Sequence, residues 1–503
     1  VASWDFYGIW YPYSNSNYKI ELFNAQYSTP LWNVSGGTSG TYAAGIRGIA
    51  VSDNAEYIAV CLANSVKLYN KQGTLSWTYT FGSGNTYYCE RVEISGDGKY
   101  IVVNAGYGGY PGRIYLFDKD SSTPLWSKSG MMKGVVDISA DGRYIVSSKH
   151  GDSHVYYFGR GSNAPLWEYE YDGCSPNVGN CYFNALSISY DGSFVSGTLH
   201  RSVSDGDQVY LFDGADGTEL WNDTLGGYTT LSWGIYSGLE ISDNGDYLVV
   251  YSGCYNNNPT CSDHAIYLYH RSSNTPLWSY TGVNLGSTVS ISANGQFILV
   301  DGAISNELNS DLLFSKANNT PLWNFTYPYG NTSLCCTSLT GLSSDGSWIS
   351  GTGVIEDGIT NAQVYYFKHN LVTKPTIIPL GPANGNKPTE PVTLRWYGGS
   401  DDRSNLTFDV YFGTSSSPTT KVADDITSMT YSPANLATNT KYYWKVVATD
   451  PSGSSTSRVM NFTYMGPMWS YETGGNVPSV AVSADGEYIV VGSGTDDEKV
   501  YLF

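Results

Sequence analysis

Charged residues are scarce in this chain, and basic residues are the scarcer kind. Only 14% of the 503 residues are charged, and 45 acidic against 26 basic side chains give a net charge of -19. An acidic field of this kind repels phosphate backbones and anionic membrane surfaces. We therefore predict that the protein has no nucleic-acid partner.

The sequence also lacks the segments and motifs that mark several other functions. No stretch approaches 18 uninterrupted apolar residues, so we predict no membrane span. The signatures GxSxG and HExxH, phosphate-cradling loops and EF-hand spacing are absent, as is the CysxxCys spacing of zinc sites. These absences predict a protein that is not an enzyme, with no catalytic residues, no metal site and no cofactor.

The dominant positive feature is a strand-turn-strand phrase that recurs along the chain. Apolar or β-branched runs flank a central pair that is mostly Asp-Gly or Asn-Gly, and these residues readily take the positive φ angles of a tight hairpin turn. The eight phrases are VSDNAEYIAV (51–60), ISGDGKYIVV (94–103), ISADGRYIVS (138–147), ISYDGSFVSG (188–197), ISDNGDYLVV (241–250), ISANGQFILV (291–300), LSSDGSWISG (342–351) and VSADGEYIVV (482–491).

Two more phrases complete each repeat. A third strand follows the hairpin, as in IYLFD (114–118) and VYLFD (209–213), and a fourth strand carries a tryptophan. The tryptophans are Trp32, Trp77, Trp126, Trp167, Trp221, Trp278, Trp323 and Trp469. Units of four antiparallel strands, repeated eight times, predict an all-β chain that forms a β-propeller, because a ring hides all but short blade edges. Either seven or eight blades close the ring.

The run VYLFDGADGTELW (209–221) resembles the tryptophan-docking repeat of quinoprotein and WD40-like propellers. The resemblance covers most of the chain and implies architecture rather than activity, because such propellers include pyrroloquinoline-quinone dehydrogenases, assembly factors and surface proteins with no reaction. Cys335-Cys336 invites comparison with the vicinal disulfide of those dehydrogenases, which makes quinone-dependent oxidation a weaker alternative. The pair lies in a late repeat rather than an early one.

The repeats are interrupted late in the chain. Between 373 and 465 the propeller phrases give way to a Pro-rich stretch and then to strand-like runs that resemble a fibronectin type III β-sandwich. The resemblance implies that Trp396 is the buried strand tryptophan and that the Tyr442 hydroxyl ties back to the backbone. We therefore expect a propeller over 1–372, an inserted module over 373–465, and last propeller strands over 466–503.

The terminal strands do not balance. Third-strand phrases occur nine times, because both KIELF (19–23) and KVYLF (499–503) qualify, whereas the other strands occur eight times. In one interpretation the surplus strand is a short edge strand of a closed ring. In the other, the terminal pieces complete a blade across two molecules, since strand addition joins chains and head-to-tail contacts generate filaments.

Cysteine usage favours export. Cys61 and Cys89 lie where adjacent repeats meet, the pairs Cys174 with Cys181 and Cys254 with Cys261 share one spacing, and Cys335 with Cys336 remain. We predict disulfides in an oxidising, extracellular or cell-surface location. The chain also opens at Val1 rather than at methionine, which we read as a signal segment removed.

Other candidates are weaker. His150, Asp152 and His154 make a conceivable metal site that is better explained as a polar loop, and Asp263-His264 is similar. The loops of the predicted cysteine-bearing face are rich in tyrosine, which suits glycan stacking or protein contacts. These tyrosines are Tyr87, Tyr88, Tyr107, Tyr110, Tyr171, Tyr182, Tyr255, Tyr327 and Tyr329. Candidate glycosylation sequons are Asn33, Asn222, Asn318, Asn324, Asn331, Asn405 and Asn461.

Taken together, the patterns predict a secreted or surface-displayed structural or adhesive protein resembling prokaryotic surface proteins. It would assemble head to tail with itself into a filament or surface layer, by strand exchange through its termini, or contact other surface proteins and glycans. An extracellular, lectin-like glycan-binding propeller is the alternative.

Overall fold

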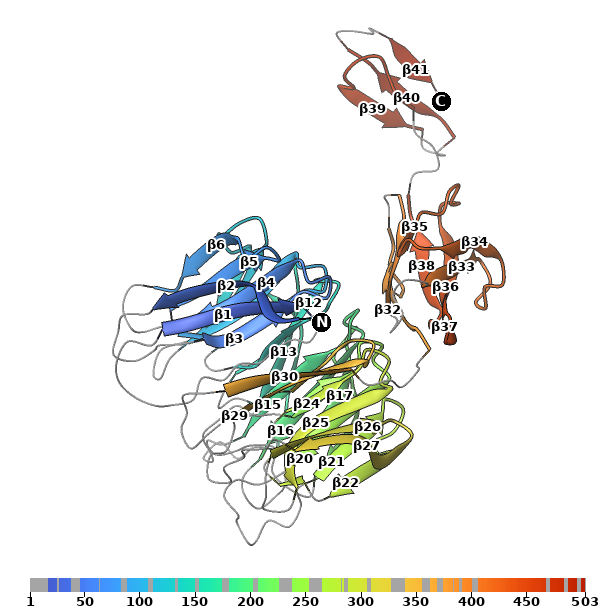
Figure 1. The fold of residues 1–503 in the computed structure, drawn as a ribbon. Helices are drawn as coiled ribbons and strands as arrows, with labels where there is room; N and C mark the ends of the chain where they lie inside the picture. The colour runs from blue at the N-terminus through green and yellow to red at the C-terminus, as the bar shows by residue number, and fades with distance from the viewer. Residues whose placement is uncertain are drawn as a thin grey trace.

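The computed structural model describes most of the chain as β-strands joined by turns (Figure 1). The described residues are 17–24, 27–37, 46–62, 64–82, 88–106, 112–131, 134–149, 153–173, 181–201, 207–225, 238–252, 265–281, 283–284, 288–304, 309–326, 340–354, 362–368, 374–382, 384–388, 391–399, 406–466, 471–483, 487–494 and 499–502. None of these residues lies in a helix, so none forms a helix that could span a membrane.

Antiparallel sheets of propeller type follow one another along the chain. The first two are β3 (Ile46–Val51), β4 (Tyr57–Leu62), β5 (Ser65–Asn70) and β6 (Leu75–Thr80), then β7 (Tyr88–Ile94), β8 (Tyr100–Gly106), β9 (Arg113–Asp118) and β10 (Trp126–Ser129). The next two are β11 (Val136–Ile138), β12 (Tyr144–Ser148), β13 (His154–Gly159) and β14 (Pro165–Glu170), then β15 (Tyr182–Ile188), β16 (Phe194–His200), β17 (Gln208–Asp213) and β18 (Glu219–Thr224).

Three more sheets continue the series. They are β19 (Leu239–Ile241), β20 (Tyr247–Ser252), β21 (Ala265–His270) and β22 (Trp278–Thr281), then β23 (Val283–Asn284), β24 (Val289–Ile291), β25 (Phe297–Ile304), β26 (Asn309–Ser315) and β27 (Asn318–Thr326), then β28 (Thr340–Leu342), β29 (Trp348–Val354) and β30 (Ala362–Lys368). In the first two of these sheets the tryptophan strand, β22 or β27, lies at one edge, as in a propeller blade, whereas the third sheet consists of β28, β29 and β30 among the described residues.

The hairpin turns follow from local chemistry. In the β7–β8 turn, the Ser95 hydroxyl donates to the Asp97 carboxylate at 2.7 Å and accepts from the Tyr100 amide at 3.0 Å. Gly98 has a φ of 73°, and a Cβ there would lie 2.6 Å from the Tyr57 ring of the preceding sheet. Glycine is therefore required both by the left-handed backbone and by the close approach of the neighbouring ring. This explains why Asp-Gly pairs mark the repeats.

Neighbouring sheets are joined by the tryptophans. The indole of Trp77 donates to the Lys119 carbonyl at 2.9 Å, and that of Trp167 donates to the Gly214 carbonyl at 2.9 Å, each reaching the following sheet. The apolar cores lie between adjacent sheets, so that one core unites Leu68 and Trp77 with Phe117. Each repeat is thus stabilised mainly by its neighbours.

Residues 374–466, which we call the inserted module, form two further sheets around one core. One sheet holds β31 (Thr376–Gly381), β32 (Leu394–Gly399) and β35 (Thr430–Tyr431), and the other holds β33 (Thr407–Gly413), β34 (Lys421–Ile426), β36 (Thr440–Asp450), β37 (Gly453–Thr456) and β38 (Met460–Tyr464). Trp396 and Trp444 are buried in this core, and the Tyr442 hydroxyl accepts a hydrogen bond from the Ala437 amide at 2.9 Å.

The two ends of the chain form separate small sheets. The N-terminal sheet consists of β1 (Asn17–Asn24) and β2 (Tyr27–Gly37), and the C-terminal sheet consists of β39 (Ser479–Val482), β40 (Ile489–Gly492) and β41 (Val500–Leu502). In Figure 1 the N-terminal sheet lies against the first propeller sheet, whereas the C-terminal sheet stands beyond the inserted module, away from the ring. The predicted fourth strand at Trp469 lies outside the described residues.

Candidate functional site

The N-terminal sheet occupies the outer half of a propeller-like sheet. β1 pairs with β2 so that Leu22 lies opposite Trp32, the register that Leu68 has with Trp77 in the first complete sheet. The Trp32 indole donates to the Lys71 carbonyl at 2.8 Å, which repeats the bond that joins successive sheets. Ile20 is buried against the first sheet with Ile58 and Val60. The N-terminal sheet therefore sits as third and fourth strands, beside the sheet that follows.

The C-terminal sheet has the sequence of inner propeller strands but not their burial. Val480, Val482 and Val490 are 64%, 61% and 41% exposed. Their equivalents in the third propeller sheet, at the same places in the repeat, are Val136, Ile138 and Val146, and these are 1%, 5% and 0% exposed. The same apolar pattern is thus covered by neighbouring sheets in the ring and open to water at the C-terminus.

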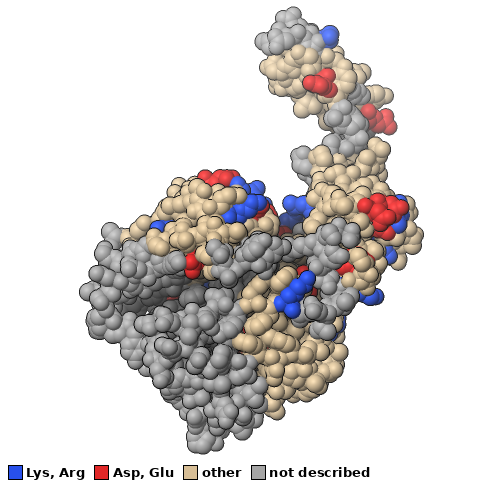
Figure 2. All heavy atoms as spheres, viewed as in Figure 1, with Lys and Arg blue, Asp and Glu red and all other residues tan. Residues whose placement is uncertain are grey.

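Few of the described residues in this part of the chain are charged. Figure 2 shows that acidic and basic residues form small, scattered groups on the face in view, and that most of the C-terminal sheet on that face is uncharged. Val500 and Leu502 of β41 are 76% and 66% exposed. The register places Val480 and Val482 on one face of the sheet and Val490 and Leu502 on the other, so apolar side chains are exposed on both faces. Exposed apolar surface of this kind marks interaction sites in soluble proteins.

A second cluster lies where the inserted module meets the hairpin turns of the ring. Tyr397 of the module stacks on Tyr190 with ring centroids 6.4 Å apart, and both pack with Ala140 and Ala293 of other turns. The carboxyl groups of Asp53 and Asp243 lie close enough to Tyr190 and Tyr397 to interact with them electrostatically. Burial, reinforced by the Asp53 charge, raises the pKa of Asp243 to about 7, and burial raises the pKa of Asp53 as well. Burial beside Asp53 also raises the pKa of Tyr397 to about 12.

An ion pair fastens the module next to this cluster. The Arg458 guanidinium of the module contacts the Asp191 carboxylate, which also accepts hydrogen bonds from the Ser193 amide and hydroxyl. Asp191 is buried, and burial lowers the pKa of Arg458 to about 10. Two buried carboxyl groups with raised pKa values therefore lie beside tyrosines at the contact between the module and the ring.

One group of acidic side chains on the module has the spacing of a cation site. Oxygen atoms of Asp409, Asp424 and Asp425 lie within 4.8 Å of one another. The Lys421 ammonium lies 2.7 Å from both the Asp409 and the Asp424 carboxylates, so it already supplies positive charge to the group. We therefore assign this group to the module's own ion pairs.

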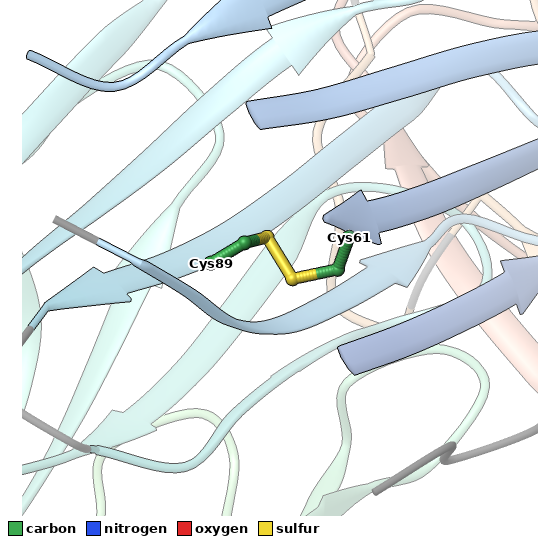
Figure 3. Close-up of a disulfide and its surroundings, with 2 residues drawn as sticks. All are labelled: Cys61 and Cys89. Carbon is green, nitrogen blue, oxygen red and sulfur yellow. A yellow bond between two sulfur atoms is a disulfide. The ribbon is translucent and has the colours of Figure 1, made fainter. Parts of the chain in front are cut away.

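The structure joins Cys61, at the end of β4, to Cys89, in β7, with the Cα atoms 5.5 Å apart (Figure 3). The disulfide links the first two propeller sheets, and both cysteines are fully buried. Cys181 is also disulfide-bonded. Cys174, Cys254, Cys261, Cys335 and Cys336 lie outside the described residues.

Three of the candidate sequons share one structural position. Asn33, Asn222 and Asn324 each follow the docking tryptophan of an outer strand, in β2, β18 and β27. Asn33 and Asn324 are exposed and Asn222 is half-buried. Asn318 is exposed in β27 and Asn461 lies in β38, whereas Asn331 and Asn405 lie outside the described residues.

The remaining predicted candidates are only partly described. His154 lies in β13 near the carboxylates of Glu168 and Glu170, at 3.4 and 3.6 Å, while His150, Asp152, Asp263 and His264 are outside the described residues. Of the tyrosines in the predicted aromatic face, Tyr88, Tyr171 and Tyr182 are in the described part of the chain. The structure therefore brings no metal-binding histidine cluster together among the described residues.

Sequence reasoning missed the cluster around Asp243 and Tyr397. A signal was present in the turn phrases. The residue after the serine is an aspartate in VSDN (51–54) and ISDN (241–244), whereas it is small in most other repeats. The approach of Tyr397 had no local signal, since it joins residues more than a hundred positions apart.

No family model matches the chain, and no curated protein matches it. Among solved structures, a chain of the mitotic checkpoint complex is 13% identical with a TM-score of 0.45, over 64% of this chain and 89% of that one. The Dos1 propeller has the same identity and TM-score, over 62% and 76% of the two chains. The Cps50 (Swd1) β-propeller domain of Myceliophteria thermophila is 9% identical with a TM-score of 0.43, over 64% and 96%. The propeller architecture rests on the sheets described above.

Proposed function

We propose that this protein is a structural subunit of the cell surface that assembles head to tail with copies of itself. One observation carries the proposal. The C-terminal sheet exposes the apolar side chains that its counterparts in the ring bury, while the N-terminal sheet holds only the outer strand positions. The C-terminal sheet supplies the inner strands of a propeller repeat, and the N-terminal sheet supplies the outer strands.

The energetics favour pairing of the two ends. Burying one Val or Leu side chain stabilises by about 1.5–3 kcal/mol, and several such side chains are open on the C-terminal sheet. A small sheet with exposed apolar side chains on both faces is only marginally stable by itself. Association that covers these side chains therefore gains free energy without any change in the ring.

The partner in this proposal is a second copy of the chain. Residues 374–466 separate the last propeller strand, β30, from the C-terminal sheet, which places that sheet away from its own ring (Figure 1). A contact between different surfaces of identical subunits repeats without closing unless its rotation closes a ring, so it generates filaments. The eight repeats then belong to a ring in which the last blade is shared between neighbours.

The inserted module is, in this proposal, a fibronectin type III-like β-sandwich. Support comes from the two sheets around buried Trp396 and from the Tyr442 hydroxyl that accepts the Ala437 amide. Here the module carries the C-terminal sheet outward from the ring.

An exported location is part of the same proposal. The Cys61–Cys89 disulfide is suited to an oxidising compartment, and the sequons at Asn33 and Asn324 expose their amides on outer strands. Mass spectrometry of tryptic peptides from the native protein checks this location. Glycan mass on the Asn324 peptide supports export, whereas unmodified sequons together with free thiols argue against it.

The test of assembly uses the full-length protein. Negative-stain electron microscopy and light scattering across dilution should reveal fibres or sheets that repeat at the size of one molecule. A chain without residues 1–34 and a chain without residues 477–503 should each stay monomeric. Retention of the cooperative thermal transition would show that the ring still folds. Isolated particles of the full-length protein at every concentration would remove the proposal.

A further inference from the structure

We infer that β39 and β40 of one copy complete the N-terminal sheet of the next copy by pairing β40 with β1, and that β41 holds the place of β1 until then. This inference rests on the proposed self-assembly and specifies its partner surface at the level of residue register. It assigns β41 a role of its own, as a temporary cover.

The register of the acceptor strand, β1, is already fixed by its pairing with β2. In the described propeller sheets the third strand places one residue opposite the docking tryptophan, as Leu116 lies opposite Trp126 and Leu211 opposite Trp221. Leu22 lies opposite Trp32 in the same way. β1 is therefore held as a third strand before any inner strand arrives.

The register of the donor is set by the same rule. In the second sheet, Val102 lies opposite Leu116 and Val103 lies opposite Tyr115. In the C-terminal sheet, Val490 lies opposite Leu502 and Val491 opposite Tyr501. The phrases KIELF (19–23) and KVYLF (499–503) align residue by residue, so Leu22 corresponds to Leu502 and Glu21 to Tyr501. In the inferred exchange, Leu22 and Glu21 take the places of Leu502 and Tyr501 opposite β40. The inferred pairs are Val490 with Leu22 and Val491 with Glu21.

β41 is the weaker of the two competing strands. It pairs with β40 through three residue pairs, whereas β1 pairs with β2 through eight. Val500 is 76% exposed in β41, while its counterpart in β1, Ile20, is 4% exposed. When β1 replaces β41 beside β40, the buried strand β1 is kept and the exposed strand β41 is released.

The inferred position of the β39–β40 hairpin lies next to the two turns at the ends of a hydrogen-bonded row. Backbone hydrogen bonds connect successive hairpin turns, from the Asn54 amide to the Gly96 carbonyl and on to the Ala293 amide, which donates to the Ser344 carbonyl at 2.8 Å. Among the described residues, the turns at 52–57 and 343–348 are the ends of this row. The β39–β40 hairpin has the same turn phrase and fits the remaining position.

A placeholder strand has a physical purpose. The edge of β40 would otherwise present unpaired backbone groups, and an open edge pairs with any strand available. β41 satisfies that edge in the free molecule and yields to β1, which brings its own partner strand and the Trp32 contact. The exchange breaks and makes backbone hydrogen bonds in similar number, so burial of the apolar side chains on β39 and β40 drives it.

The test uses two single-cysteine additions in otherwise full-length chains, Glu21→Cys and Val491→Cys. Opposed residues in antiparallel strands lie about 4.5–5.5 Å apart, within the Cα range of a disulfide. The two variants are mixed, allowed to assemble and oxidised mildly, and crosslinked dimers are measured by non-reducing electrophoresis. The matched control replaces Val491→Cys by Val480→Cys, which lies on β39 and does not face β1 in the inferred register.

The inference expects crosslinked dimers from the first mixture and at least tenfold fewer from the control mixture. A chain lacking 499–503 should still assemble, and faster. Filaments that form without the Glu21–Val491 crosslink would overturn the register while leaving self-assembly intact. A double variant that crosslinks within single chains and stays monomeric would overturn both, because the C-terminal sheet then closes its own ring.

Discussion

The indole of Trp32 donates a hydrogen bond to the carbonyl of Lys71, across 2.8 Å, and stacks near the Tyr69 ring. The same donor and the same kind of acceptor join the propeller sheets along the ring, as with Trp77 and Lys119. An N-terminal strand is thus locked to the first sheet as if a complete blade preceded it.

Replacing Trp32 should loosen the N-terminal sheet and weaken assembly. Trp32→Ala removes the indole contact with Lys71 and Tyr69, and we expect a loss of about 1–3 kcal/mol, less than for a fully buried tryptophan because this side chain is half-buried. Trp32→Phe keeps the ring and should lose about 1 kcal/mol. Thermal unfolding measures the stability, and sedimentation measures the polymer. Equal polymer from wild type and Trp32→Ala would contradict the acceptor role.

A charge at an exposed apolar position of the C-terminal sheet should abolish assembly without unfolding the chain. Val482 is 61% exposed in the isolated molecule, so Val482→Lys should leave its melting temperature nearly unchanged. Covering that lysine in an apolar contact costs several kcal/mol, which shifts the equilibrium to monomer. Val459→Lys, at a 36% exposed position of the inserted module, is the control. Light scattering compares the two, and similar polymer yields would contradict the expectation.

Removing Arg458 should release the inserted module from the ring. Arg458→Met leaves the buried Asp191 carboxylate without its cation, although Ser193 still donates to it, and we expect a loss of about 2–3 kcal/mol. Hydrogen exchange should rise in the turns around Tyr190, and small-angle scattering should show a larger radius of gyration. Adding Asp191→Asn should restore part of the loss. Lys441→Met, an exposed change on the module, should alter neither measurement.

The free energy of unfolding should depend on pH through the titration of Asp243. Burial and the neighbouring Asp53 raise the folded pKa of Asp243 from 3.8 to about 7, so the folded chain holds this proton more tightly than the unfolded chain. The group therefore lowers the free energy of unfolding as pH rises from about 4 to 7, and its effect is constant above 7. Asp243→Asn removes this penalty and should raise the melting temperature more at pH 7.5 than at pH 4.5.

Melting curves of Asp243→Asn and wild type at several pH values measure the difference, at about 2–4 °C for each kcal/mol. Asp246→Asn is the control, because Asp246 pairs with Arg271 outside the cluster of Asp53, Tyr190 and Tyr397. A gap between Asp243→Asn and wild type that does not vary with pH would contradict the assignment.

Much of the fold was predictable because its signals are local. Asp97 and Gly98 impose their turn through a side-chain hydrogen bond and a positive φ, and the strands on either side alternate as the turn requires. The docking tryptophans were recognisable for the same reason, since most of them follow the third strand at a similar short spacing. Strands and sheets of propeller type could therefore be predicted without knowledge of distant contacts.

The position of the C-terminal sheet could not be predicted. Val482 and Val490 occupy the same repeat positions as Ile138 and Val146, so the local pattern specifies a hairpin but not the ring that receives it. The stacking of Tyr397 on Tyr190 was equally hidden, because it depends on how the module docks. Local chemistry determines pairing within a repeat, whereas placement depends on long-range packing.

The separation of the two terminal sheets has a directional consequence. An assembly built from such chains is polar: one tip presents a free C-terminal hairpin and the other presents an unfilled N-terminal seat. A chain stripped of its C-terminal sheet still carries the seat, so it would act as a chain terminator at one tip only. Growth rates at the two tips would then respond independently to small amounts of that fragment.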